Sequence, residues 1–284
     1  MLNTEPIGEA MDILQEYKKK GIYVKHAVTE APSDADFPMH IHGTCEIYFF
    51  LAGKVEYLVE GACYPLRSGS LLLMRPAESH KPRILASLGY ERYNINFPLS
   101  MFADMDPEGR LLRPLTDRPL GRGNLYTSDE LADLPLQKLF FEMCYSTEDE
   151  YGKRLKIRTN LLRILDAVYQ AYLQRGAAEY TPPACRNEEI VAYVNAHLSE
   201  DLSIPLLAEH FFLSPSQFNR VFKAATGAAP WTYITAKRLT AAKEKIRGGA
   251  SVQSAFEGSG FGDYSAFYRA YTKHFGHAPT EDNG

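Results

Sequence analysis

The chain has 284 residues, of which 45% are hydrophobic and 23% charged, and its formal net charge is −4. This length exceeds the usual span of one domain, and the composition is that of a globular protein, so we expect two folded domains. The chain lacks both an apolar run of the roughly 18–20 residues that cross a bilayer and a signal-type start. These features exclude a membrane-spanning protein and predict a cytoplasmic one without a membrane partner.

The four cysteines lie far apart, with no paired spacing (Cys45, Cys63, Cys144 and Cys185). Such spacing is not that of a zinc ribbon or of a disulfide framework. We therefore expect buried thiols without a chemical role.

The region from about residue 22 to residue 100 predicts short strands. Its segments are rich in β-branched and aromatic residues and are separated by Gly, Pro and Asn (residues 23–28, 46–52, 54–61, 63–66, 70–76 and 90–97). Many short, closely spaced strands are typical of a sandwich or a barrel.

A histidine motif lies within this region. His40, His42 and Glu46, followed by Gly53, have the H-x-H-x₃-E-x₆-G spacing, which resembles that of a cupin barrel. Alternation along a strand places the first three side chains on one face, and a paired strand could bring His80 beside them. Three imidazoles and a carboxylate are ligands that suit Zn, Mn, Fe or Ni.

From about residue 130 the pattern becomes helical. Residues 134–146 and 153–176 carry leucines and aromatics at intervals of three and four. In the second helix we expect one apolar stripe (Leu155, Leu162, Leu165, Val168, Tyr169 and Tyr172). Residues 176–186 contain two prolines and small residues, which predicts a linker. The expected fold is α+β and multidomain: a barrel with a helical pair over residues 1–175, then an all-helical domain over 187–284.

The segment from Ile204 to Gly227 predicts a helix, a tight turn and a second helix. Ser214 is a good N-cap, and Pro215 suits the first helical position. Phe218 and Phe222 then fall on one face of the second helix, whereas the polar residues fall on the other. A packed helix followed by a helix with a polar outward face is the helix-turn-helix pattern.

The same pattern recurs 49 residues later in the chain. Asp263 replaces Ser214 as the cap, and Arg269 matches Arg220. Phe267, Tyr271, Gly276 and Pro279 stand at the positions of Phe218, Phe222, Gly227 and Pro230. Caps, core aromatics and one arginine thus repeat together, which indicates an internal duplication. The segment from Ser214 to Lys273 contains nine Lys or Arg residues and only three acidic residues, as expected of a phosphate-binding surface.

These residues resemble the arabinose-regulator (AraC/XylS) family over roughly residues 187–279. The resemblance rests on Ser214, Arg238-Leu239 and Gly260-Phe261-Gly262-Asp263. It implies a helix over about residues 231–247 that holds two helix-turn-helix units against successive major grooves of double-stranded DNA. Phe256, Ser259 and the residues after Pro279 depart from the family pattern. We therefore expect the first unit to contribute more sequence discrimination.

The resemblance also assigns residues to DNA. Ser216, Asn219 and Arg220 of the first unit, and Tyr264, Ser265 and Arg269 of the second, would face the bases, and the cap residue Ser214 is also assigned to the DNA-binding surface. Arg can be bidentate to guanine and Asn to adenine. Lys223, Arg238 and Lys273 are the phosphate candidates.

The barrel has three interpretations. His40, His42, Glu46 and His80 would bind a divalent metal, line an effector pocket, or serve the fold alone. By strand alternation Tyr48, Arg92 and Asn94 join the candidate effector residues, and Asn96 shares their face. Polar groups between aromatics suit a small polar effector such as a sugar.

The sequence thus predicts an effector-controlled transcription regulator that is not an enzyme and requires no cofactor. The resemblance implies activation, a homodimer formed through the helices around residues 131–175, and RNA polymerase as a further partner. Two alternatives stay open: a cupin-type metal-dependent enzyme with an accessory helical domain, and a DNA-binding protein that needs no ligand.

Overall fold

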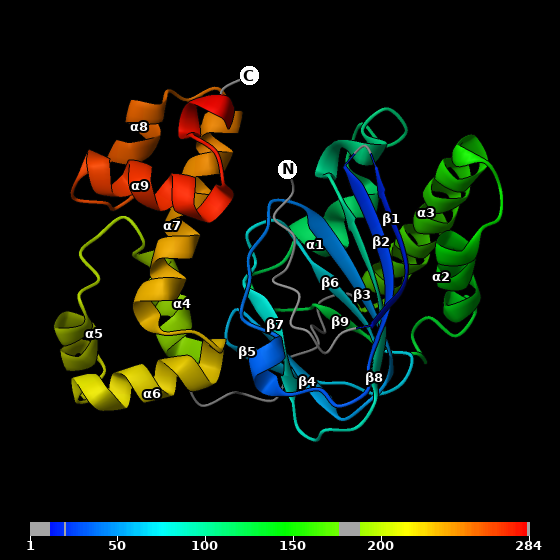
Figure 1. The fold of residues 1–284 in the computed structure, drawn as a ribbon, viewed down its shortest axis with the longest axis horizontal. Coiled ribbons are helices and arrows are strands. Elements are labelled where there is room, and N and C mark those ends of the chain that lie inside the picture. The colour runs from blue at the N-terminus through cyan, green and yellow to red at the C-terminus, as the bar shows by residue number, and fades with distance from the viewer. Residues whose placement is uncertain (1–11, 20, 176–187, 283–284) are drawn as a thin grey trace.

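The computed structural model describes residues 12–19, 21–175 and 188–282. A sheet-rich unit ends with Arg175, and an all-helical unit that begins at Glu188 lies beside it (Figure 1). The predicted α+β, two-domain architecture is confirmed. The predicted linker, residues 176–186, lies outside the described residues.

Antiparallel strands form two facing sheets in the first unit. The larger sheet has the order β1-β2-β8-β3-β6-β9 (Asp12–Lys19, Ile22–Thr29, Tyr90–Phe97, Cys45–Ala52, Leu71–Met74 and Leu125–Tyr126). The smaller sheet has the order β5-β4-β7 (Ala62–Pro65, Val55–Val59 and His80–Ile84). A backbone bridge between His40 and His80 lies next to the start of β7.

The register of β3 and β8 decides which side chains share the interior. Glu46 lies opposite Asn96, and Tyr48 lies opposite Asn94. Because residues paired across a ladder point to the same face, these four side chains point toward the space between the two sheets. The predicted alternation along both strands is therefore confirmed.

Three strands were not among the predicted segments: β1, β7 and β9. The sequence of β1, DILQEYKK, alternates charged or polar residues with apolar ones, and most of its residues are exposed. It pairs only with β2 within the larger sheet, so it is an edge strand. Charged residues are common on edge strands because they oppose further pairing, and they weaken the strand signal in the sequence.

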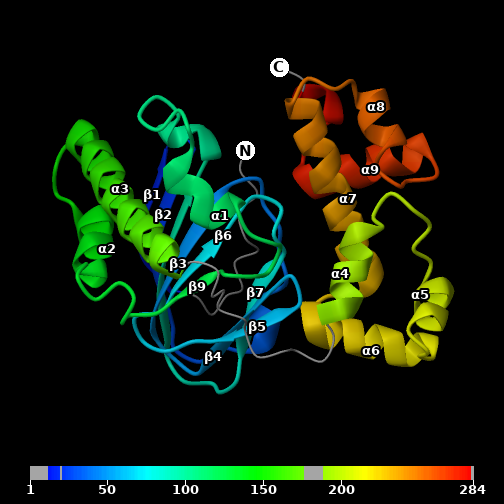
Figure 2. The ribbon, with the colours of Figure 1, turned by 180° about the vertical axis from the view of Figure 1, so that it is seen from behind.

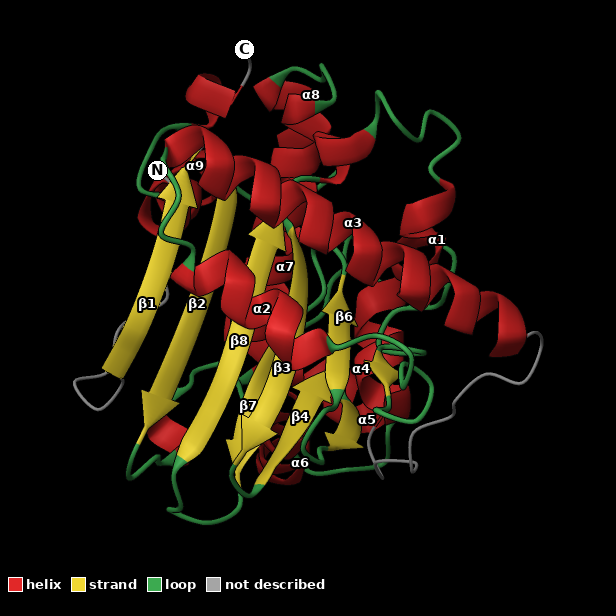
Figure 3. Ribbon diagram, turned by 90° about the vertical axis from the view of Figure 1, so that its right-hand side faces the viewer, coloured by secondary structure: helices red, strands yellow, loops and turns green. Residues whose placement is uncertain are grey.

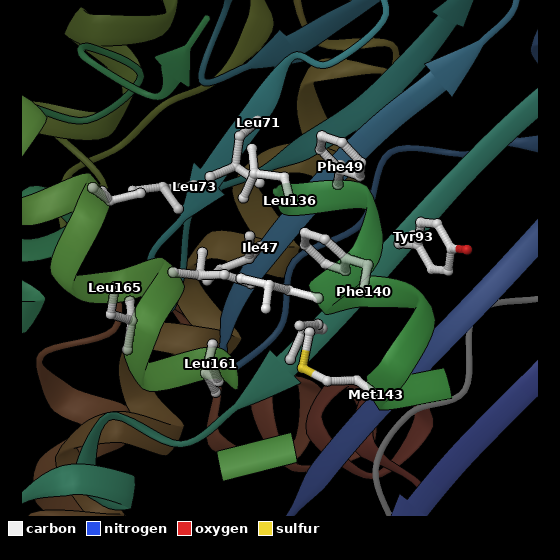
Figure 4. Packing of buried hydrophobic residues seen from close by; sticks show 14 of the residues in the cluster. Ile47, Phe49, Leu71, Leu73, Tyr93, Leu136, Phe140, Met143, Leu161 and Leu165 are labelled. Carbon is white, nitrogen blue, oxygen red and sulfur yellow. The ribbon is translucent and has the colours of Figure 1, made fainter. Parts of the chain in front are cut away.

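Helices α2 (Leu136–Tyr145) and α3 (Glu150–Arg175) cover the outer face of the larger sheet (Figure 3). Figure 4 shows side chains of both helices packed on β3, β6 and β8. The rings of Phe49 and Phe140 stack there with centroids 4.9 Å apart. This core fixes the position of β3, which carries Glu46 on its other face.

The stripe predicted for α3 is partly wrong. Leu165 and Val168 are buried as expected, but Leu155 is 51% exposed. The inward face instead includes Ile157 and Leu161. Apolar residues occupy more than one face of this helix, so periodicity alone did not identify the face that meets the sheet.

The second unit contains six helices within the described residues, α4 to α9 (Glu188–Ala196, Ile204–His210, Pro215–Thr226, Pro230–Arg247, Val252–Glu257 and Tyr264–Phe275). Helix α7 runs from the core around α4, α5 and α6 to the core around α8 and α9 (Figure 2). The short helix predicted at 204–210 is confirmed, and α7 begins one residue before the predicted position.

Three of the four cysteines lie among the described residues. Cys45, Cys63 and Cys144 are buried free thiols, as predicted, and burial raises the pKa of Cys45 and of Cys144 to about 12. Such thiols are protonated and unreactive near neutral pH. Cys185 lies outside the described residues.

Candidate functional site

Two helix-turn-helix units, α5–α6 and α8–α9, lie at the two ends of α7. Ser214 and Asp263 each accept a hydrogen bond from the backbone amide three residues later, at 3.2 and 2.7 Å. Gly227 and Gly276 end α6 and α9 in the left-handed region, at φ +80° and +77°. The repeat predicted from caps and C-terminal glycines is confirmed.

The outward faces of α6 and α9 carry the residues predicted to read bases. All of them are exposed (Ser216, Asn219, Arg220, Tyr264, Ser265 and Arg269), and so is the cap residue Ser214. The inward positions Phe218, Phe222, Phe267 and Tyr271 are fully buried. The core aromatics therefore orient both helices with their polar faces toward solvent.

The second unit packs closely despite its departures from the family pattern. Phe256 is partly buried and meets the Phe267 ring at 5.7 Å between centroids. Ser259 is buried, and its hydroxyl donates to the Phe256 carbonyl at 2.5 Å. The predicted difference in DNA discrimination between the two units stays a prediction.

The nine basic residues between Ser214 and Lys273 divide into two groups. Five bond to other groups of the chain: Lys237 to Glu60, Lys243 and Arg247 to Asp282, and Arg238 and Lys245 to backbone carbonyls. Four are exposed and make no ion pair or hydrogen bond with any described residue: Arg220, Lys223, Arg269 and Lys273. Within the helical unit, the unengaged positive charge among the described residues is thus confined to α6 and α9, where a phosphate backbone would compensate it.

Arg238 is a correction to the predicted phosphate contacts. Only 5% of the residue is exposed, and its guanidinium donates to the carbonyls of Leu198 and Glu200 at 2.7 and 2.6 Å. These bonds join α7 to the segment between α4 and α5. Arg238 therefore stabilises the first unit and does not reach a phosphate.

In the barrel, the predicted histidine cluster is assembled. The backbones of His40 and His80 exchange hydrogen bonds of 3.1 and 3.0 Å, which bring the loop before β3 to the start of β7. One ligand atom from each of His40, His42, Glu46 and His80 lies within 4.8 Å of the others. His42 is 22% exposed at its side chain, so solvent reaches the cluster on that side.

Glu46 is a buried carboxylate with polar partners on both oxygens. Oε1 accepts from Asn94 Nδ2 at 2.7 Å, and Oε2 accepts from His42 Nε2 at 2.8 Å and from Asn96 Nδ2 at 3.0 Å. Burial alone would raise the pKa of Glu46, but the hydrogen bond from His42 and the proximity of the His80 ring lower it well below its usual value. The carboxylate is therefore ionised and available to a cation.

The four residues fit a divalent cation. His80 Nδ1 lies 2.8 Å from the Glu78 carbonyl, which orients the ring and leaves Nε2 toward the cluster, 3.5 Å from Glu46 Oε2. That buried Nε2 makes no hydrogen bond with a described residue. Metal-binding histidines usually donate one ring N–H to a carbonyl or carboxylate and bind the metal through the other nitrogen, and His80 has the first of these two contacts.

Tyr48 and Arg92 lie deeper in the interior and already have partners. The hydroxyls of Tyr48 and Tyr90 are 2.7 Å apart. The Arg92 guanidinium lies 4.1 Å from the Tyr90 ring centroid and donates to Thr29 Oγ1 at 3.0 Å. Aromatic side chains fill this part of the interior, so effector contacts by Tyr48 and Arg92 stay predictions.

The sequence interpretation missed one polar group that joins the two units. Glu60, in the β4–β5 turn, is buried against Asn195, Tyr233 and Lys237 of the helical unit. A glutamate directly before Gly61, where a hairpin turn normally has Asn, Asp or Gly, was the available signal.

Two capped recognition helices with exposed basic faces, beside a barrel with a polar cluster, define a DNA-binding regulator with a ligand-binding domain. A family model described as the AraC-like ligand binding domain matches residues 26–165. A second, described as a helix-turn-helix domain, matches residues 207–283. The chain belongs to the AraC family of transcriptional regulators, with an effector-binding domain followed by a DNA-binding domain.

Individual proteins are similar over different parts of the chain. Regulatory protein PocR of Salmonella typhimurium is 28% identical over 142 residues, 50% of this chain and 44% of PocR. The HTH-type transcriptional activator RhaS of Escherichia fergusonii is 25% identical over 253 residues, 86% of this chain and 87% of RhaS. The solved structure of ToxT from Vibrio cholerae is 14% identical, with a TM-score of 0.37, covering 92% of this chain and 97% of ToxT.

The match to PocR thus spans less than half of that protein's length. The family models and the similarity to RhaS place the chain among regulators of transcription and not among enzymes. No helix among the described residues combines the length and the apolar character that a membrane span requires.

The two roles assigned to arginine on α6 and α7 are separable. We expect Arg238→Ala to lower the free energy of unfolding by about 1–3 kcal/mol, because it removes a buried side chain and its hydrogen bonds to the carbonyls of Leu198 and Glu200. We expect Arg220→Ala to change it by less than about 0.5 kcal/mol, since Arg220 is exposed and unpaired among the described residues. Urea unfolding followed by circular dichroism measures both, and equal losses would contradict the assignment.

Proposed function

We propose that this regulator recognises a specific double-stranded DNA sequence through α6 and α9 and responds to a small polar effector at the histidine cluster. The observation that carries the DNA proposal is that, within the described helical unit, the unengaged positive charge lies on the two recognition helices. Arg220 and Arg269 occupy equivalent positions in the repeat, so each would present a guanidinium to one major groove. Lys223 and Lys273, three and four residues further along, would contact phosphates.

The first unit is proposed to discriminate more strongly between sequences than the second. We expect Arg220→Ala to weaken binding to a specific duplex by about 1–3 kcal/mol, which is roughly 5- to 150-fold. We expect Arg269→Ala to cause a smaller loss, and Lys273→Ala to weaken specific and nonspecific duplexes equally. Fluorescence anisotropy with both duplexes at fixed salt measures this, and equal loss of discrimination in the two arginine variants would contradict it.

The effector proposal rests on the arrangement around Glu46. Three imidazoles, a carboxylate and the amides of Asn94 and Asn96 surround one point that is open to solvent beside His42. We propose that a divalent cation is held there, and that it supplies a positive centre for the hydroxyl or carboxylate oxygens of the effector. A sugar is the effector class we propose first, because its hydroxyls can also bond to the surrounding amides and imidazoles.

Metal binding is testable without knowing the effector. We expect the full chain to bind one Zn²⁺, and His42→Ala to weaken that binding by at least about tenfold because a ligand is removed. His210→Ala is the matched control, since His210 is exposed on α5 and outside the cluster. Competition with a chromophoric chelator measures the affinities. Equal Zn²⁺ affinity in wild type and His42→Ala would exclude this site and leave a metal-free effector pocket.

A homodimer is proposed to form through α2 and α3. Large apolar side chains on these helices are exposed, among them Phe141 (54%), Tyr151 (65%), Leu155 (51%) and Leu173 (50%). Such side chains are typical of an interface when they lie close together. Analytical ultracentrifugation at micromolar concentration is expected to give twice the chain mass of 32.0 kDa, and a monomer would exclude the dimer.

The proposed direction of control is activation, with RNA polymerase as a partner. The support is similarity to RhaS, a protein described as a transcriptional activator, over 87% of its length. A reporter behind a bound site should be transcribed more when the protein is present, and reduced transcription would reverse the assignment.

A further inference from the structure

Glu60, in the turn of the β4–β5 hairpin, contacts the helical unit. Glu60 and Gly61 form the two-residue turn between Val59 and Ala62, with φ of +49° and +85°. Residues with a side chain disfavour φ > 0, so Glu60 adopts a backbone conformation that is unfavourable for glutamate. A Cβ at Gly61 would meet Val191 of α4 at 2.9 Å, so glycine is needed for this close approach.

The Glu60 carboxylate is shared between the two units. Oε2 accepts from Asn195 Nδ2 and from the Tyr233 hydroxyl, both at 2.6 Å. Oε1 accepts from Lys237 Nζ at 2.8 Å and from the backbone amide of Ser79 at 2.5 Å. The side chains of Glu60 and Lys237 are 1% and 6% exposed. Loss of either partner would leave the other as a buried, uncompensated charge, so this contact holds the docked arrangement of the two units.

The strand that touches this contact also carries a residue of the histidine cluster. Around β7 the chain alternates: Ser79 and Lys81 face the helical unit, and His80 between them points into the cluster. The Ser79 hydroxyl lies 3.4 Å from that of Tyr233, and the Lys81 side chain packs against Gly227. The Ala77 carbonyl accepts from Lys237 Nζ at 2.9 Å.

The loop before β3, which supplies His40 and His42, also contacts the helical unit through residues next to its histidines. His40 is bridged to His80, and its neighbour Met39 packs against the core of the first helix-turn-helix unit. Gly43, directly after His42, approaches Glu244 near the end of α7. Both backbone segments that supply histidines therefore touch the DNA-binding unit with their adjacent residues.

We propose that docking of the DNA-binding unit through Glu60 and Lys237 opposes ligation at the histidine cluster, so that each state weakens the other. The inference rests on the proposed metal site. Two ligands of one Zn²⁺, each bound at about 2.1 Å, lie no more than about 4.2 Å apart, whereas the four ligand atoms here lie within 4.8 Å of one another. In this proposal, contraction around the cation moves His40 and His80 toward the cluster, and their neighbours move with them, away from the contacts with Lys237 and Tyr233.

Because such coupling is reciprocal, a change in Zn²⁺ affinity alone is enough to measure it. Glu60→Gln and Lys237→Met in the full chain are each expected to tighten Zn²⁺ binding by about fivefold or more. The double variant is expected to tighten it no further, since both substitutions break the same contact. The matched control is Glu56→Gln, because Glu56 lies on β4 and pairs with Arg83 within the barrel unit.

Small-angle X-ray scattering gives a readout that needs neither DNA nor effector. Zn²⁺ should increase the radius of gyration of the wild type, and Glu60→Gln should have the larger radius without Zn²⁺. If the wild type binds Zn²⁺ but Glu60→Gln and Lys237→Met bind it with unchanged or weaker affinity, the coupling is overturned and the metal site stands. A wild type that binds no Zn²⁺ overturns the metal site and the coupling together.

Discussion

The arrangement of the molecule depends on one buried carboxylate. Glu60 is removed from water at the junction of the two units, and a charge in that position must be compensated by hydrogen bonds and by an opposite charge. Its partners come from α4, from α7 and from the backbone before β7. The contact therefore places α7 of the DNA-binding unit directly against the barrel, beside β7, which carries His80.

A second buried carboxylate organises the barrel interior in a similar way. Glu46 is held by His42, Asn94 and Asn96 on the face of β3 that points between the sheets, while Phe49 on the opposite face packs under α2. Because alternate residues of a strand serve opposite faces, one strand connects the helix-covered core to the polar cluster. The alternation around His80 then connects that cluster to the DNA-binding unit.

Local patterns predicted the parts of the structure that depend on local chemistry. The caps Ser214 and Asp263, the C-terminal glycines of α6 and α9, and the shared face of Glu46 and Tyr48 follow from nearest neighbours and strand alternation. Features that depend on partners distant in the chain were missed. Arg238 reads as an exposed cation until its carbonyl acceptors are known, and Glu60 has no visible partner in its own segment.

The central claim is that the two units of this chain read one specific DNA sequence together. The most direct test is selection of bound duplexes from a random pool by the full-length protein. The account predicts a recovered site with two conserved blocks about one helical turn, roughly 10 base pairs, apart, because α6 and α9 lie at the two ends of α7. Recovery of no preferred sequence would contradict it. Recovery of a single conserved block, unchanged when one of the two helix-turn-helix units is altered, would contradict it as well.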